Sequence, residues 1–354
     1  MNKVCEILFS ALRSALFGVE VDTDVYQKLS AEEWTQLYRM SAQQGVMAIV
    51  YDVVSQLPKE SQPPRNINIQ WALSAENISK RYEKQKIAAI NLSTFLSSHN
   101  IHFMIIKGLG LSKYYPNPKF RECGDIDIYT FGDYEKCNEL IRSIKVNVNV
   151  ENSKHSTFVY SGVMVENHKT LINTYSESGV RLNSYLEEIA SKQLCMQCKE
   201  ILFPNNYFNV LFLLRHMLSH LSRRELAVRN VVDWGLFLDR EFAKLDKTIL
   251  AELLSKYQLV DAYNCFISVA YNIMGGNLDR CYVNKSCSQV STADKVLDVI
   301  LCNNLKIEKS FSSIGKLRRL FSSYWMYKEL IPDKFWGEVV CHSVRHYIND
   351  LMRS

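Results

Sequence analysis

The sequence predicts an α+β protein in which a small mixed sheet lies between two helical regions. Residues 1–99 and 204–354 carry apolar side chains at helical spacing, whereas residues 100–203 contain short β-rich runs separated by helices. A compact sheet with helices packed on it satisfies such an order of elements. We therefore expect an N-terminal helical segment (1–99), an α/β core (100–203) and a larger C-terminal helical domain (204–354).

The N-terminal region begins with amphipathic helices. Ser30 is followed three residues later by Glu33, which is the spacing of a capping box and predicts a helix that runs through Met40. A second helix is expected over residues 45–57. The paired prolines of SQPPR end it, because proline does not continue a helix. One long helix is then predicted over residues 66–98, with KRYEKQK on its polar side.

Strand signals dominate the central region. The run IHFMII predicts a buried strand, and Gly108 and Gly110 mark a turn into a short helix that PNP ends. GDIDIYT predicts a second strand, and DYEKCNELIRSI predicts an amphipathic helix with Asp133 as its cap. Three further β-rich segments follow, namely KVNVNV, STFVY and GVMVEN. Helices return after about residue 181 and continue through the C-terminal region.

Composition limits the classes of function. Of the 354 residues, 47% are apolar and 22% are charged, which is typical of a folded globular chain. The net charge of +5 suits an anionic ligand and argues mildly against nucleic acid as the partner. The N-terminus has no small-residue cleavage site, and the longest apolar segment, NVLFLLRHMLSHL, is too short to span a bilayer. The ten irregularly spaced cysteines suit free thiols, so we expect a cytoplasmic protein without a membrane partner.

Two carboxylates lie inside the second predicted strand. Asp125 and Asp127 are two residues apart and therefore point to the same face, while Ile126 and Ile128 point into the core. Like charges at this spacing repel each other unless a cation lies between them. Divalent cations prefer carboxylate oxygens, and paired Mg²⁺ ions support in-line phosphoryl displacement. The alternative is an exposed strand end with two solvated aspartates.

The stretch around these carboxylates resembles a known signature. IIKGLGLSKYYPNPKFRECGDIDIYTF is similar to the motif of the nucleotidyltransferase superfamily that includes DNA polymerase beta, in which a strand, a glycine turn and a short helix precede a strand with Asp-x-Asp. It resembles more narrowly a bacterial family of uncharacterised nucleotidyltransferases. The matching positions are Lys107 and Gly108, Tyr115 and Pro116, Arg121, Asp125 and Asp127. The turn departs from the superfamily's usual Gly–Ser or Gly–Gly.

The resemblance implies the transfer of a nucleoside monophosphate from an NTP to a hydroxyl of a small molecule, peptide or protein. Asp125 and Asp127 would hold Mg²⁺ or Mn²⁺, and Gly108 would lie along the triphosphate. Lys107 and Arg121 would neutralise phosphate charge. From the residues alone, Lys107 could instead be a surface lysine, and Arg121 could pair with Glu122 or Glu135. The alternative function is an inactive nucleotide-binding or partner-binding protein on the same scaffold.

A third carboxylate is expected on a later strand of the same sheet. Glu166 is the candidate, because it lies in the β-rich run GVMVEN and shares a face with Met164 and His168. The resemblance supports this choice, since the narrower family shows an acidic–x–His pattern there. We therefore predict that Glu166 lies close enough to Asp125 and Asp127 to share a metal ion with them, and that His168 contributes to ligand binding. The alternative is a solvated glutamate on an edge strand.

Two histidines on a C-terminal helix complete the candidate residues. His216 and His220 are four residues apart and therefore lie on one helix face, and Asp233 follows on the next helix. We predict that these histidines face the ligand site from its acceptor side. The alternative is a pair of histidines hydrogen-bonded at a contact between helices.

Overall fold

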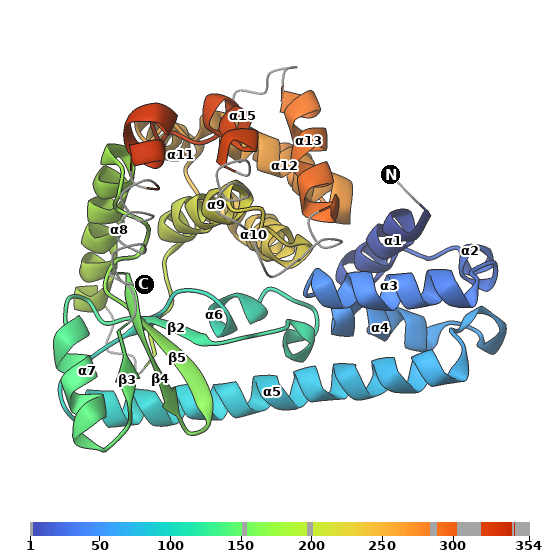
Figure 1. The fold of residues 1–354 in the computed structure, drawn as a ribbon, viewed down its shortest axis with the longest axis horizontal. Coiled ribbons are helices and arrows are strands. Elements are labelled where there is room, and N and C mark those ends of the chain that lie inside the picture. Colours follow the sequence, from blue (N-terminus) through green and yellow to red (C-terminus); the bar gives the residue numbers. More distant parts are fainter. Residues whose placement is uncertain are drawn as a thin grey trace.

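The computed structural model describes residues 3–150, 154–196, 201–283, 289–302, 320–341 and 343. It confirms the predicted α+β class, in which one small mixed sheet is surrounded by helices. Figure 1 shows the sheet beneath the C-terminal helices and beside the N-terminal ones, with a single long helix running along the bottom of both.

Of the N-terminal helices, α3, α4 and α5 lie close to their predicted places. They are α1 (Lys3–Phe17), α2 (Thr23–Gln27), α3 (Ala31–Gln43), α4 (Met47–Gln56) and α5 (Arg65–Ser97). The capping box at α3 is confirmed, because Glu33 N donates to Ser30 Oγ at 3.1 Å and Ser30 N donates to Glu33 Oε2 at 2.8 Å. Helix α5 follows the paired prolines directly and has 33 residues, a length of about 50 Å. It packs against α4 near one end and against the sheet near the other (Figure 1).

The sheet contains five strands in the order β1-β2-β5-β4-β3. These are β1 (Met104–Ile105), β2 (Ile126–Tyr129), β3 (Val148–Asn149), β4 (His155–Tyr160) and β5 (Val163–His168). Strands β2 and β5 are parallel, and every other pair is antiparallel. Strand β1 is shorter than the run IHFMII, and the glycine turn that follows it leads into the short helix α6 (Leu109–Ser112). Helix α7 (Tyr134–Ser143) follows β2, and Asp133 stands at its N-cap without a side-chain capping bond.

The two faces of the sheet have different surroundings. One face carries Ile126, Ile128 and Val165, which pack with apolar side chains of α5 and α7 in a small hydrophobic core. The opposite face carries Asp127, Glu166 and His168 and is turned toward the C-terminal helices (Figure 1). The alternation of side chains along each strand therefore separates the core of the sheet from a polar surface.

The C-terminal region is helical, as predicted. Its helices are α8 (Glu177–Met196), α9 (Asn206–Ser222), α10 (Val228–Glu241), α11 (Lys247–Lys256), α12 (Val260–Met274), α13 (Gln289–Cys302) and α15 (Tyr324–Glu329). Their buried side chains share one large core with those of α1, α3 and α4, so the two helical regions pack together. The division of the chain at residues 99 and 203 remains a proposal.

The described helices also bear on the predicted environment. None of them combines the length and the apolar composition that crossing a bilayer requires. Among the described cysteines, Cys123, Cys137 and Cys265 are free thiols.

Candidate active site

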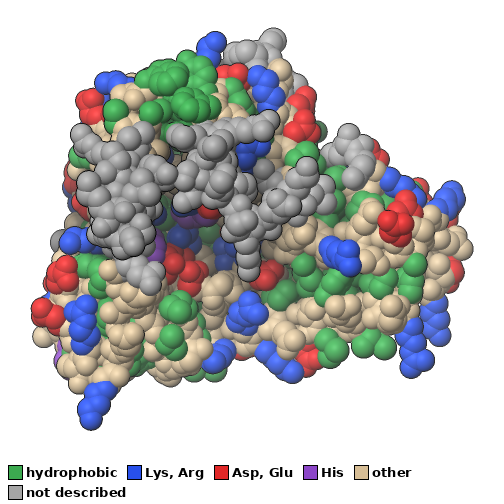
Figure 2. Space-filling view, viewed as in Figure 1, with side chains coloured by type: hydrophobic (Ala, Val, Ile, Leu, Met, Phe, Trp, Pro, Cys, Tyr) green, Lys and Arg blue, Asp and Glu red, His purple; other side chains and the backbone are tan. Residues whose placement is uncertain are grey.

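Three carboxylates meet at one place on the polar face of the sheet. Asp127 on β2 pairs in register with Glu166 on the parallel strand β5, and paired residues of neighbouring strands point to the same face. Asp125 directly precedes β2, two residues before Asp127, and shares that face. The structure therefore places Glu166 beside the Asp-x-Asp pair. Figure 2 shows acidic, basic and histidine side chains gathered near the middle of this side of the molecule.

Asp127 is buried and has two close nitrogen partners. Its Oδ1 lies 2.6 Å from Lys107 Nζ and 2.9 Å from His168 Nε2, and the residue is only 4% exposed. Burial alone would raise the pKa of Asp127, but Lys107 and His168 outweigh it, so the pKa lies below its ordinary value. Glu166 has weaker contacts, since its Oε2 lies 3.5 Å from His168 Nε2 and its Oε1 lies 3.7 Å from His155 Nε2.

Asp125 is the least compensated of the three carboxylates. Burial and the neighbouring charges of Asp127 and Glu166 raise its pKa, and Lys107 offsets only part of this effect. An added cation between these side chains would relieve the repulsion among them.

The glycine turn lies against the same residues. Gly108 has a φ of +55°, a backbone conformation that residues with a side chain rarely adopt. A Cβ at this position would lie 3.5 Å from the Asp125 carbonyl oxygen. Lys107 directly precedes this turn and is the residue that reaches Asp127. The turn therefore brings backbone and one lysine to the edge of the carboxylate group.

Arg121 is engaged in a buried ion pair. Its Nη2 lies 2.7 Å from Asp233 Oδ2 on α10, and its Nε lies 3.1 Å from Asp233 Oδ1. The Tyr115 hydroxyl donates to the same Asp233 oxygen at 2.7 Å. Pairing of Arg121 with Glu122 or Glu135, one possibility from the sequence, is therefore wrong. Contact of Arg121 with a nucleotide would require the guanidinium to leave Asp233.

The two histidines of α9 reach the site through Lys107. His216 Nε2 lies 3.2 Å from Lys107 Nζ, and His220 Nε2 lies 3.3 Å from His216 Nε2. Burial and the nearby Lys107 charge hold the pKa of His216 well below its ordinary value, so its ring is neutral near pH 7. The histidines thus lie on the side of α9 that faces the carboxylates, at a contact between the helix and the sheet region.

Two residues of this site were not identified from the sequence. His155 on β4 pairs across the sheet with His168, and Lys154 directly precedes it. Burial and the neighbouring Lys107 lower the pKa of Lys154 to about 8. The only signal in the sequence was their position next to the run STFVY, since neither residue has a motif of its own.

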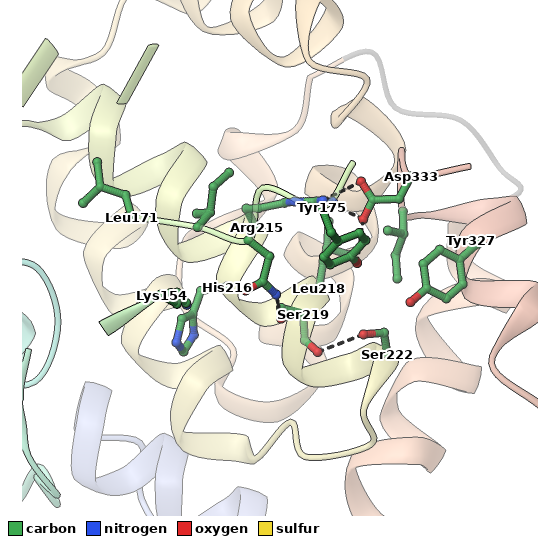
Figure 3. A pocket seen from close by; sticks show the side chains of 13 residues that line it. Lys154, Leu171, Tyr175, Arg215, His216, Leu218, Ser219, Ser222, Tyr327 and Asp333 are labelled. Carbon is green, nitrogen blue, oxygen red and sulfur yellow. Dashed lines mark hydrogen bonds and ion pairs between the residues drawn. The ribbon is translucent and has the colours of Figure 1, made fainter. Parts of the chain in front are cut away.

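A cavity extends from the site between α9 and the loop after β5. Figure 3 shows Lys154 and His216 at one end of it and the Arg215–Asp333 ion pair at the other. Arg215 Nη2 lies 2.5 and 2.6 Å from the two carboxylate oxygens of Asp333. The cavity is small, with a volume of about 20 Å³, and both polar side chains such as Tyr175 and apolar ones such as Leu218 line it.

Carboxylate oxygens and a histidine nitrogen form a group that could hold a metal ion. In the part of the chain that the structure describes, one such group of three or more residues is present, consisting of Asp127, Glu166 and His168, whose ligand atoms lie within 4.8 Å of one another. The α+β fold with its small mixed sheet fits a nucleotidyltransferase domain. The chain belongs to the uncharacterised nucleotidyltransferase family, whose model matches residues 30–275. Neither curated proteins nor solved structures gave a significant match.

Proposed function

We propose that this protein is a metal-dependent enzyme that transfers a nucleoside monophosphate from an NTP to a hydroxyl of a small molecule, peptide or protein. The observation that carries the proposal is the side-by-side placement of Asp127 and Glu166 on parallel strands, with Lys107 in contact with the Asp127 carboxylate. Membership of the nucleotidyltransferase family supports it. In this reaction the hydroxyl oxygen bonds to the α-phosphorus. The bond between the α-phosphorus and the oxygen that bridges it to the β-phosphate breaks, and pyrophosphate leaves.

The residues present fit a bound Mg²⁺ or Mn²⁺. Asp125, Asp127 and Glu166 would hold the ion, since burial and the charges of Asp127 and Glu166 raise the pKa of Asp125, and a cation would relieve this repulsion. A bound ion would stabilise the negative charge that develops on the phosphate oxygens. Glu166 completes the carboxylate set, either as a ligand or as the base that takes the proton of the acceptor hydroxyl.

The residues around the carboxylates would bind and orient the nucleotide. Gly108 allows the backbone of the turn to approach a phosphate closely, and Lys107 would neutralise phosphate charge once an ion has replaced it at Asp127. His216 and His220 would border the acceptor, because they adjoin Lys107 from the helical side. Lys154 and the cavity beyond His216 lie on that side as well.

The first experiment measures nucleotide binding without turnover. Each of the four NTPs, as an analogue that cannot be cleaved at the α-phosphorus, is added with Mg²⁺ or Mn²⁺ and the thermal unfolding temperature is recorded. A ligand at about 100 times its Kd stabilises the folded state by about 2.7 kcal/mol. We expect this stabilisation in the parent and its loss in Asp127→Asn. Asp133→Asn is the matched control, because Asp133 lies at the start of α7, outside the site.

The second experiment separates an enzyme from an inactive binding protein. NTP labelled at the α-phosphate is incubated with the full chain and either a small-molecule fraction or a protein fraction, and label transfer and pyrophosphate are measured together. Equal amounts of both products, absent in Asp127→Asn, are expected for the transferase. Nucleotide binding with no transfer to any fraction would favour the inactive scaffold, and the absence of nucleotide binding would contradict the proposal.

A further inference from the structure

One nitrogen atom stands among the carboxylate oxygens of the site. His168 Nε2 lies 2.9 Å from Asp127 Oδ1 and 3.5 Å from Glu166 Oε2. Adjacent ligands of an octahedral ion are about 3 Å apart when each lies about 2.1 Å from the ion. Both distances from His168 are close to that spacing, and the three ligand atoms all lie within 4.8 Å of one another.

The fold fixes the direction in which His168 presents this nitrogen. The residue is 2% exposed, lies two positions after Glu166 on β5, and packs against the ring of His155 at a centroid distance of 5.4 Å. Its Nδ1 is buried and has no hydrogen-bond partner among the described residues. Every polar contact that the structure gives this ring is therefore made through Nε2, toward the carboxylates.

A metal ion can replace Lys107 as the partner of Asp127. Lys107 Nζ lies on Asp127 Oδ1 but also lies 3.2 Å from His216 Nε2, so a second partner is already within reach. An ion at Oδ1 would replace the single charge of Lys107 with two charges among three carboxylates. To bind the ion, the His168 ring would have to carry its proton on Nδ1, so that Nε2, which now faces the Asp127 carboxylate, offers its lone pair.

We propose that His168 is a nitrogen ligand of the ion at this site, together with Asp127 and Glu166, and that the site therefore prefers Mn²⁺ and other first-row transition ions to Mg²⁺. Mg²⁺ takes oxygen ligands almost exclusively, whereas imidazole binds transition ions well, and affinity for a nitrogen-containing site rises along the first row. This inference rests on the proposed function, because it assumes that the carboxylates hold an ion.

The test is pulsed EPR of Mn²⁺ bound to the full chain without nucleotide. We expect modulation from a directly bound nitrogen, and we expect protein labelled with ¹⁵N-histidine to replace the ¹⁴N pattern with that of ¹⁵N. The labelled parent requires no substitution, so the test does not depend on the folding of a variant. Binding at this site is defined as the Mn²⁺ that Asp127→Asn fails to bind.

Two variants identify the histidine. In His168→Gln the nitrogen modulation should disappear and the Mn²⁺ affinity should fall by about tenfold or more, while the Mg²⁺ affinity changes much less. His155→Gln is the matched control, because His155 adjoins Glu166 at 3.7 Å but should leave the modulation intact. Parent protein that binds Mn²⁺ through Asp127 without nitrogen modulation would overturn the inference and leave the proposed function standing. Modulation lost in His155→Gln instead would also overturn it. No Mn²⁺ bound through Asp127 would overturn both.

Discussion

Replacing Asp233 with Asn should destabilise the protein strongly, because it leaves a buried arginine without its charge partner. The Arg121 and Asp233 side chains are 7% and 4% exposed, and they make two contacts of 2.7 and 3.1 Å. Breaking one partner of a buried ion pair costs about 3–5 kcal/mol. This is a large part of the 5–15 kcal/mol that typically separates folded and unfolded states. We expect Asp233→Asn to lower the free energy of unfolding by about 3–5 kcal/mol.

The assay is urea-induced unfolding followed by far-UV circular dichroism. The matched control removes all three polar partners at once, as Tyr115→Phe, Arg121→Met and Asp233→Leu, since a lone Tyr115 hydroxyl would also be left unpaired. Replacing a whole buried ion pair with apolar side chains is often neutral or stabilising. The triple variant should therefore recover most of the loss. A loss below about 1 kcal/mol in Asp233→Asn, or a triple variant no more stable than it, would refute this reasoning.

The same triple variant tests what Arg121 contributes to the site. Arg121 Nη1 donates to the Glu122 carbonyl oxygen and lies 3.8 Å from where a Cβ on Gly108 would stand. The ion pair therefore holds the Arg121 guanidinium next to the glycine turn. In the parent, Asp233 already holds the Arg121 guanidinium. We therefore expect the triple variant, which removes Arg121 together with Asp233, to bind nucleotide nearly as well as the parent. A stable triple variant that has lost nucleotide binding would instead assign Arg121 to the triphosphate.

Three further predictions concern the carboxylates and their lysine. Asp127→Asn should abolish the metal-dependent NTP stabilisation of about 2.7 kcal/mol, and normal stabilisation by differential scanning fluorimetry would contradict the metal assignment. Lys107→Met should weaken NTP binding about tenfold while strengthening the binding of the metal alone, because the cation that competes for Asp127 is removed. Calorimetric titration measures both, and a parallel fall would contradict the prediction. Asp125 has a raised pKa in the folded state, so between its ordinary and its raised pKa the folded state binds more protons than the unfolded state. The stability of the metal-free protein should therefore fall as pH rises through that window. Asp125→Asn should remove this decline and be more stable than the parent at pH 7, as urea unfolding at several pH values can show.

The sequence predicted the features that depend on local spacing. The alternation of side chains along a strand placed Asp125 and Asp127 on one face, and it placed Glu166 and His168 together on another strand. The starts of α3 and α5 followed from the capping box at Ser30 and the paired prolines. Each of these signals lies within a few residues of the feature it predicts.

Local spacing in the sequence could not predict contacts between residues far apart in the chain. Arg121 and Asp233 are 112 residues apart, and the nearer carboxylates Glu122 and Glu135 were the obvious partners in the sequence. Lys154 gains its importance only because the chain brings it beside Lys107, which lies on another element. Likewise, the parallel pairing of β2 with β5 determines that the faces of the two strands coincide, and alternation within one strand cannot specify that pairing.

In the proposed function, Lys107 would couple the binding of the metal to the binding of the nucleotide. Its ammonium lies 2.6 Å from Asp127 and 3.2 Å from the neutral ring of His216, so without an ion the lysine serves as the counter-charge of Asp127. An ion at Asp127 would repel the lysine toward His216, which cannot neutralise its charge. The freed ammonium would then need an anion, which the triphosphate of an NTP beside the Gly108 turn would supply. Each ligand should therefore strengthen the binding of the other by the same factor, because such coupling is reciprocal. Lys107→Met should reduce this coupling even where the carboxylates remain intact.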